Sequence, residues 1–168
     1  MKRAFGILIV LFLAVNLTAQ EFEIPENYVL ATTEDYAKYE KDIIASTIWM
    51  ENTPLDKNEN KRKEVNGFFM EWLTGCSTVS VNLNADYVMK YTEKNPELLM
   101  IFLAGWTRYV LENDYSKDPY KGYFAGYKSI INVYKKGKGI NKNQDLEKLI
   151  KVYDKGNLEK WIAENIIL

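Results

Sequence analysis

Apolar residues recur at helical spacing along most of the chain beyond residue 31. Residues at positions i, i+3, i+4 and i+7 lie on one face of a helix. Apolar residues follow this spacing in one segment after another, and short polar links separate the segments. It predicts helices over residues 33–52, 56–75, 85–94, 96–112, 119–136, 146–155 and 158–162. We therefore expect an all-α fold, a single globular bundle of about seven helices.

The segment 96–112 is the most apolar of these helices. Leu98 to Thr107 carry no charge, and ten residues fall far short of the roughly 20 that a membrane span needs. Its first half is apolar on every side, so we expect other helices to surround it as the centre of the bundle. Gly105 weakens a helix, and a close helix crossing at this point would offset that cost.

Helix starts carry their own signals. Thr32 or Thr33, Asn84, Asn95 and Asp118 are residue types that cap a helix N-terminus, and proline follows the last two directly. The stretch 77–84 differs, because Val79, Val81 and Leu83 alternate with polar residues. That period of two predicts a strand, which would pair at most with residues 28–30 in a two-stranded ribbon. The competing interpretation is a helix that continues through the stretch.

The first nineteen residues have the pattern of a secretory signal peptide. Lys2 and Arg3 precede about 12 apolar residues, and cleavage is expected between Ala19 and Gln20. An uncleaved N-terminal anchor is the alternative. Cleavage would leave an extended lead-in over 20–31, a single helical domain over 32–168 and no transmembrane span, so we expect a periplasmic or secreted location.

The amino-acid composition excludes several kinds of partner and active site. Loss of Lys2 and Arg3 leaves 20 of the 22 basic residues against 23 acidic ones, a net charge of −3, which gives no reason to expect nucleic acid as a partner. The chain has no histidine, which removes histidine-based catalysis and histidine-ligated zinc. Cys76 is the single cysteine, and we expect it to be buried. We predict no metal site, no cofactor and no catalytic residue.

Five residues are candidates for ligand binding. Glu71 is an acid set between apolar neighbours. Arg108 lies on the most apolar helix of a chain rich in lysine, so it would bind a carboxylate partner or an anion or, in the interpretation we favour, pair with Glu112 one turn away. Tyr120, Tyr123 and Tyr127 would form an aromatic surface for sugars or peptides, although core packing is the interpretation that we favour for them.

Four stretches resemble an uncharacterised family of exported α-helical proteins of Bacteroidota-type bacteria. They are "NLTAQ", "IWMENTPLDKNENKRKEVNGFFMEWLTG", "NPELLMIFLAGWTRYVLEN" and "LEKLIKVYDKGNLEKWI". The resemblance implies an exported bacterial protein and carries no active-site residue. We expect an envelope domain that binds an unidentified protein, small molecule or glycan without catalysis. The alternatives are a carboxylate-dependent hydrolase, with glycans as one substrate class, and a scaffold subunit of an envelope complex.

Overall fold

The computed structural model describes residues 21–166, so the expected signal peptide and its cleavage site lie outside the described residues. Within that range the chain is all-helical, as predicted. The eight helices are α1 (Thr33–Lys38), α2 (Glu40–Asn52), α3 (Glu59–Gly75), α4 (Ala85–Thr92), α5 (Glu97–Glu112), α6 (Pro119–Lys136), α7 (Gln144–Asp154) and α8 (Leu158–Asn165).

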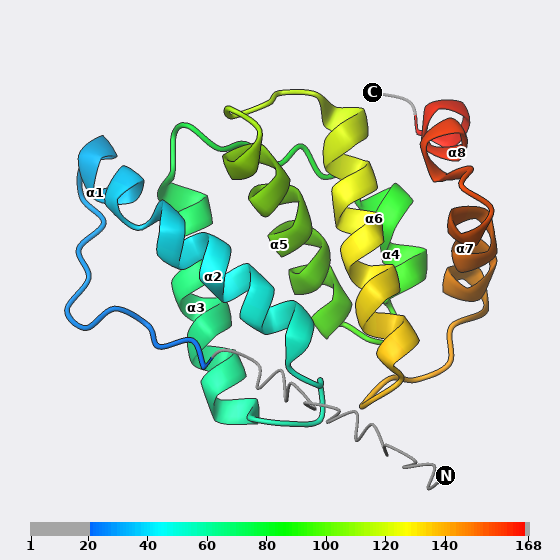
Figure 1. Cartoon of the computed structure of the whole chain (residues 1–168), viewed down its shortest axis with the longest axis horizontal. Helices are drawn as coiled ribbons and strands as arrows, with labels where there is room; N and C mark the ends of the chain where they lie inside the picture. Colours follow the sequence, from blue (N-terminus) through cyan, green and yellow to red (C-terminus); the bar gives the residue numbers. More distant parts are fainter. Residues whose placement is uncertain (1–20, 167–168) are drawn as a thin grey trace, which may run out of the picture.

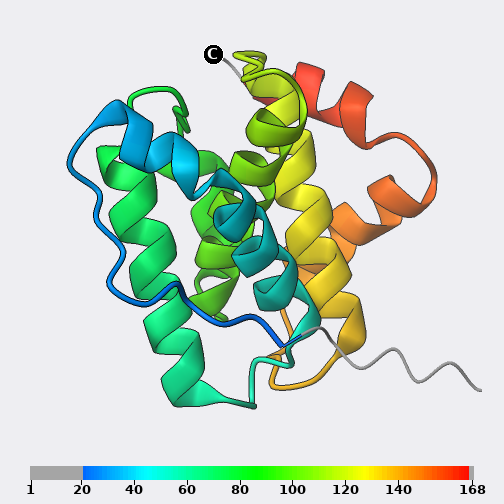
Figure 2. The ribbon, with the colours of Figure 1, turned by 60° about the vertical axis from the view of Figure 1, so that its left-hand side comes forward.

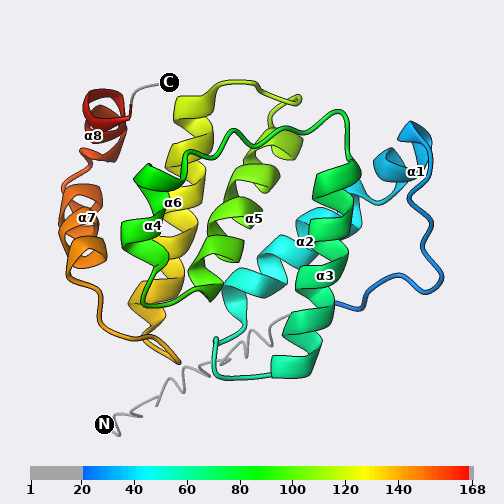
Figure 3. The same ribbon diagram turned by 180° about the vertical axis from the view of Figure 1, so that it is seen from behind.

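The antiparallel hairpin of α5 and α6 forms the middle of the bundle (Figure 1). Helices α2 and α3 lie on one side of it, and α7 and α8 lie on the other. Seen from behind, α4 covers the hairpin, and the segment between α3 and α4 crosses one end of the bundle (Figure 3). The lead-in runs back along α3 (Figure 2), where Phe22 and Tyr28 pack against Phe68.

The predicted first helix is divided in two, which accounts for eight helices where about seven were expected. The backbone of Tyr39 leaves helical geometry, with φ −96° and ψ 5°, and its N–H donates to Tyr36 instead of continuing the α-helical ladder. The Tyr39 ring is buried and contacts Tyr28 and Phe68 edge to face. The break between α1 and α2 thus coincides with packing of this ring against the lead-in and α3. No local sequence pattern predicts the break.

Most of the predicted caps are confirmed. Thr32 and Asp35 form a reciprocal capping box at α1, while Asn84 and Asp118 accept N–H bonds at the starts of α4 and α6. The cap predicted at Asn95 is wrong. Its side chain bonds instead to both backbone groups of Asn141, donating to the carbonyl at 2.8 Å and accepting from the N–H at 2.7 Å. A long-range link thus replaces the local cap.

Helix α5 is the centre of the bundle, as its sequence predicts. It packs against α2, α3, α4 and α6, and eight of its residues are buried. The close crossing expected at Gly105 is present: a Cβ at this position would lie 2.2 Å from Oγ of Ser129 on α6. Gly122 and Gly126 on α6 in turn receive the rings of Trp106 and Phe102. Glycine on both helices therefore permits a close α5–α6 contact.

The predicted β element is wrong, because no strand is found in the part of the chain that the structure describes. The alternation itself does sort the side chains of 77–84, with Val79 buried and Thr78, Ser80 and Asn82 exposed. The segment is extended but has no partner strand. The hydroxyl of Tyr123 holds it instead, accepting from the Asn84 N–H at 2.9 Å and donating to the Asn82 carbonyl at 3.5 Å.

No helix among residues 21–166 combines the length and the apolar character required to cross a membrane.

Replacing Gly105 with alanine tests the close helix contact. The added Cβ would overlap Ser129 and approach the Ala125 carbonyl, so we expect Gly105→Ala to lower the free energy of unfolding by about 1–3 kcal/mol in urea denaturation. Gly67→Ala is the matched control, because that helical glycine on α3 has no atom near its Cβ position. It should stabilise the protein by about 0.5–1 kcal/mol. Equal effects of the two substitutions would contradict a close contact between α5 and α6 at Gly105.

Candidate functional site

A pocket of about 530 Å³ lies where the segment 76–84 meets the turn between α5 and α6. Its wall combines hydroxyl and amide side chains with aromatic and apolar ones. The lining residues are Ser77, Thr78, Ser80, Asn82, Trp106, Val110, Tyr115, Ser116, Lys117 and Pro119. We call this site the hydroxyl pocket. Its volume falls within the range typical of small-molecule sites.

The polar wall of the hydroxyl pocket follows from the alternating sequence of 77–84. Val79 packs into the core, so the neighbouring Thr78 and Ser80 project to the other side of the extended backbone. Tyr123 is fully buried, and its hydroxyl fixes the far end of the segment. Cys76, which is buried as expected, anchors the near end and makes a 3.2 Å contact with the Thr78 hydroxyl.

The opposite rim is formed by the turn that follows α5. Asp114 and Tyr115 both adopt left-handed backbone conformations, with φ of 51° and 55°, which side-chain-bearing residues rarely do. The Tyr115 ring is exposed, and its hydroxyl donates to both carboxylate oxygens of Glu40, at 2.9 and 3.0 Å. This hydrogen bond to a carboxylate raises the pKa of Tyr115. A strained turn and a charged acceptor thus hold an exposed aromatic ring at the pocket entrance.

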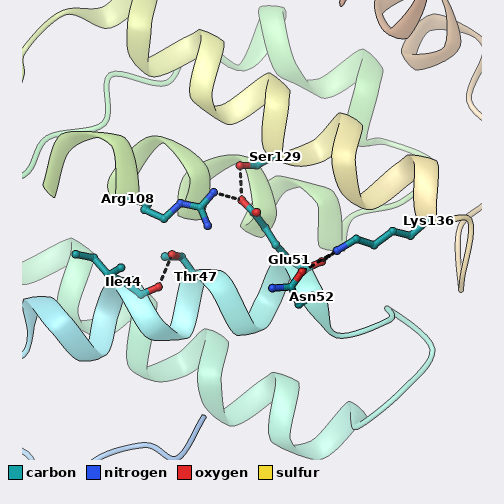
Figure 4. A network of polar contacts seen from close by, with 7 residues as sticks. All are labelled: Ile44, Thr47, Glu51, Asn52, Arg108, Ser129 and Lys136. Carbon is teal, nitrogen blue, oxygen red and sulfur yellow. Dashed lines mark hydrogen bonds and ion pairs between the residues drawn. The ribbon is translucent and has the colours of Figure 1, made fainter. Parts of the chain in front are cut away.

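A second polar site joins α2, α5 and α6. Glu51 extends from α2 to the hairpin, where it accepts a bond from Arg108 Nη2 at 2.7 Å and a short one from the Ser129 hydroxyl (Figure 4). Both charged side chains are largely buried, with 11% of Glu51 and 22% of Arg108 exposed. Next to it, Lys136 donates to the Glu51 carbonyl and the Asn52 side chain, so it binds the C-terminal end of α2, where the helix dipole favours a cation.

Arg108 therefore has a different partner from the one we favoured. The predicted ion pair with Glu112 is wrong, because among residues 21–166 Arg108 pairs with Glu51 instead, at 2.7 Å. Glu51 is largely buried whereas Glu112 is exposed, and the Ser129 hydroxyl holds the Glu51 carboxylate beside Arg108. Arg108 also lines a groove of about 320 Å³ between α5, α6 and α8.

The other candidate residues do not converge on one site. Tyr123 and Tyr127 are fully buried, and Tyr127 donates to the Tyr87 carbonyl at 2.8 Å. Burial raises the pKa of both phenols. The core interpretation thus describes these two rings, whereas Tyr120 is 42% exposed.

Glu71 lies apart from both sites and accepts a 2.6 Å bond from Tyr28, which connects the lead-in to α3. That bond raises the pKa of Tyr28 to about 12. Glu71 therefore makes a structural contact, the hydrogen bond to Tyr28. Residues 21–166 contain no group of three or more His, Cys, Asp or Glu side chains that could hold a metal ion.

Sequence reasoning missed Glu51 and the hydroxyl pocket. A usable signal for Glu51 existed, because it follows Ile43 and Thr47 at four-residue spacing and so belongs to the buried face of its helix. For the pocket, the polar half of the 77–84 alternation was the signal. Neither pattern identifies the distant residues that complete the site.

Breaking the Glu51–Arg108 pair should be costly. In Arg108→Met the buried carboxylate loses its cation, so we expect the free energy of unfolding to fall by about 3 kcal/mol. The double variant Glu51→Gln/Arg108→Met removes both charges and should recover much of that loss. Lys63→Met breaks an exposed pair with Glu59 and should change stability by less than about 1 kcal/mol in the same urea titration. A comparably small effect of Arg108→Met would show that the buried pair contributes nothing.

The resemblance of four segments to exported proteins of Bacteroidota-type bacteria concerns location, and it stays a prediction. It supplies no functional residue for the hydroxyl pocket or for the Glu51–Arg108 cluster. No protein-family model matches this chain, and neither a curated protein nor a solved structure matches it.

Proposed function

We propose that this protein is an exported, non-catalytic binding domain that holds a small neutral, polyhydroxylated ligand, a sugar or short glycan, in the hydroxyl pocket. The observation that carries this proposal is the composition of the pocket wall. Five side chains there are neutral hydroxyl or amide groups, from Ser77, Thr78, Ser80, Asn82 and Ser116. Each both donates and accepts hydrogen bonds, as does each hydroxyl of a sugar.

The aromatic residues of the wall complement these polar groups. Trp106 packs against Tyr123 with ring centroids 4.8 Å apart and lines the pocket with its remaining surface. One edge of the indole ring, with Nε1, lies against Gly122 of α6, so the ring contributes a firmly packed apolar surface to the wall. Tyr115 adds a second amphipathic ring at the entrance. Such rings bind the apolar faces of sugars while their polar tips hydrogen-bond.

The wall is held in place before any ligand arrives. The Tyr123 hydroxyl fixes the backbone at Asn82 and Asn84, and Glu40 fixes the hydroxyl of Tyr115. A preorganised wall loses less conformational entropy on binding, which favours affinity. This rigidity supports a binding function.

The structure offers less support for the two alternatives, a glycan hydrolase and a scaffold subunit. A glycan hydrolase of the usual type needs two carboxyl groups flanking the scissile bond. None of the ten lining residues is Asp or Glu, although Lys117 adds one cation. For a scaffold subunit, an extended apolar surface is the expected feature. Five large apolar side chains are exposed among residues 21–166. Val29, Ile48 and Met89 come from separate parts of the chain, and only Tyr115 and Tyr120, at the turn between α5 and α6, lie close in sequence.

A panel of neutral mono- and disaccharides tests the proposal. We expect saturation-transfer NMR to detect binding by at least one sugar, and Trp106→Phe to weaken that binding by about twofold to tenfold through loss of ring area. Trp161→Phe is the matched control, because Trp161 lies on α8 outside the hydroxyl pocket. Since Trp106 also packs in the core, Ser80→Leu provides a second variant on an exposed residue and should block the pocket.

Three results would refute the proposal. The first is that no sugar in the panel binds. The second is that binding is unaffected by both Trp106→Phe and Ser80→Leu. The third is turnover, seen as new reducing ends released from an oligosaccharide, which would favour the hydrolase alternative.

The proposed export rests on the signal-peptide pattern of residues 1–19 and on the family resemblance, and it has its own test. When the full-length chain is expressed in a bacterial host, we expect N-terminal sequencing of the periplasmic fraction to begin at Gln20. A chain that starts at Met1 and stays in the cytoplasm would contradict export and would leave the sugar-binding proposal intact.

A further inference from the structure

We propose a second binding site, the groove between α5, α6 and α8 that Arg108 lines, and we infer that it binds a short zwitterionic peptide of about two residues. Its lining includes Arg108, Lys128, Glu112, Lys121 and Glu159. The groove shares no residue with the hydroxyl pocket, so either site can exist without the other.

The charges of the groove are divided between its two ends. Helices α5 and α6 are antiparallel, and Gly105 lies against Ser129, which places Lys128 at the Gly105 end. Glu112 is the last residue of α5, and Lys121 lies in the first turn of α6, so both belong to the opposite end. One end is thus cationic and the other carries the acids.

Existing ion pairs leave one charge free at each end. At the cationic end Glu51 neutralises Arg108, and Lys128 has no ion-pair partner among residues 21–166. At the acidic end Lys121 pairs with Glu159 at 2.9 Å, while Glu112 has no partner within the same range. A ligand with one carboxylate and one ammonium group would neutralise Lys128 and Glu112 together. An anion alone or a cation alone would neutralise only one of them.

Arg108 adds hydrogen-bond donors to the cationic end, although Glu51 neutralises its charge. Only its Nη2 bonds to a described side chain, Glu51, so the rest of its planar fork is available to the carboxylate of a ligand. Glu51 and Ser129 hold the guanidinium in position before binding. The same network that connects three helices thus orients a donor at the groove.

The spacing of Arg108 and Glu112, the two residues that would bond directly to the ends of the ligand, fits a dipeptide better than a free amino acid. They are four residues apart on one helix, a rise of about 6 Å, and Lys128 adds its charge from α6. An extended dipeptide spans about 7 Å, at 3.3–3.6 Å per residue, whereas one amino acid covers half of that. Tyr109 and Phe124 also line the groove and would accept an apolar side chain.

Four related probes test this inference by amide chemical-shift titration of the folded protein. They are L-alanyl-L-phenylalanine, its N-acetyl form, its C-terminal amide and free L-phenylalanine. We expect the unmodified dipeptide to shift amides of α5 and α6 around the groove. Each of the other three should bind at least about tenfold more weakly, because each lacks one charge or the required span.

Variants that remove single charges test whether the dipeptide binds in this groove. Lys128→Gln and Glu112→Gln change exposed side chains that have no ion-pair partner among residues 21–166, so neither should disturb folding. Each should weaken dipeptide binding about tenfold. The matched controls Lys151→Gln and Glu93→Gln alter exposed charges outside the groove and should leave the affinity unchanged.

Three outcomes would overturn the inference. One is the absence of any shift with the dipeptide at about 10 mM, a concentration that would reveal even millimolar affinity. Another is equal binding of all four probes, which would reflect the phenyl ring alone. The third is retention of full affinity by both Lys128→Gln and Glu112→Gln.

Discussion

Gly105 and Gly126 remove the side chains that would otherwise hold α5 and α6 apart. The resulting contact lets Ser129 reach Glu51 and lets the Phe102 ring lie against the backbone of α6. Trp106 and Tyr123 meet across the same hairpin, one lining the hydroxyl pocket and the other holding the segment that forms its polar wall. The two faces of this one helix pair therefore set the positions of both candidate sites.

Local patterns in the sequence were sufficient for most of the fold. Period and capping signals are properties of neighbouring residues, so the helices, the central position of 96–112 and the caps at Thr32 and Asp118 could be predicted. The division at Tyr39 could not, because it accompanies ring contacts with distant Tyr28 and Phe68. Asn95 shows the same limit, since its partner lies 46 residues further along the chain.

The candidate site was less predictable for a related reason. Arg108 was correctly singled out as unusual, yet its partner Glu51 lies 57 residues away and on another helix. Sequence spacing offered only Glu112 as a neighbour, because it reveals partners on the same helix alone. A buried ion pair of this kind gains little stability compared with apolar packing. In this protein the pair, together with Ser129, connects α2 to both helices of the hairpin.

Cys76 stands at the start of the segment that forms the polar wall, and 8% of it is exposed. Because a thiolate reacts only when a reagent can reach it, labelling of the folded protein has to await local opening of that segment. The rate of modification by a thiol reagent would accordingly measure how often the wall departs from the core. With no other cysteine in the sequence, that kinetic signal would report on this one region without interference.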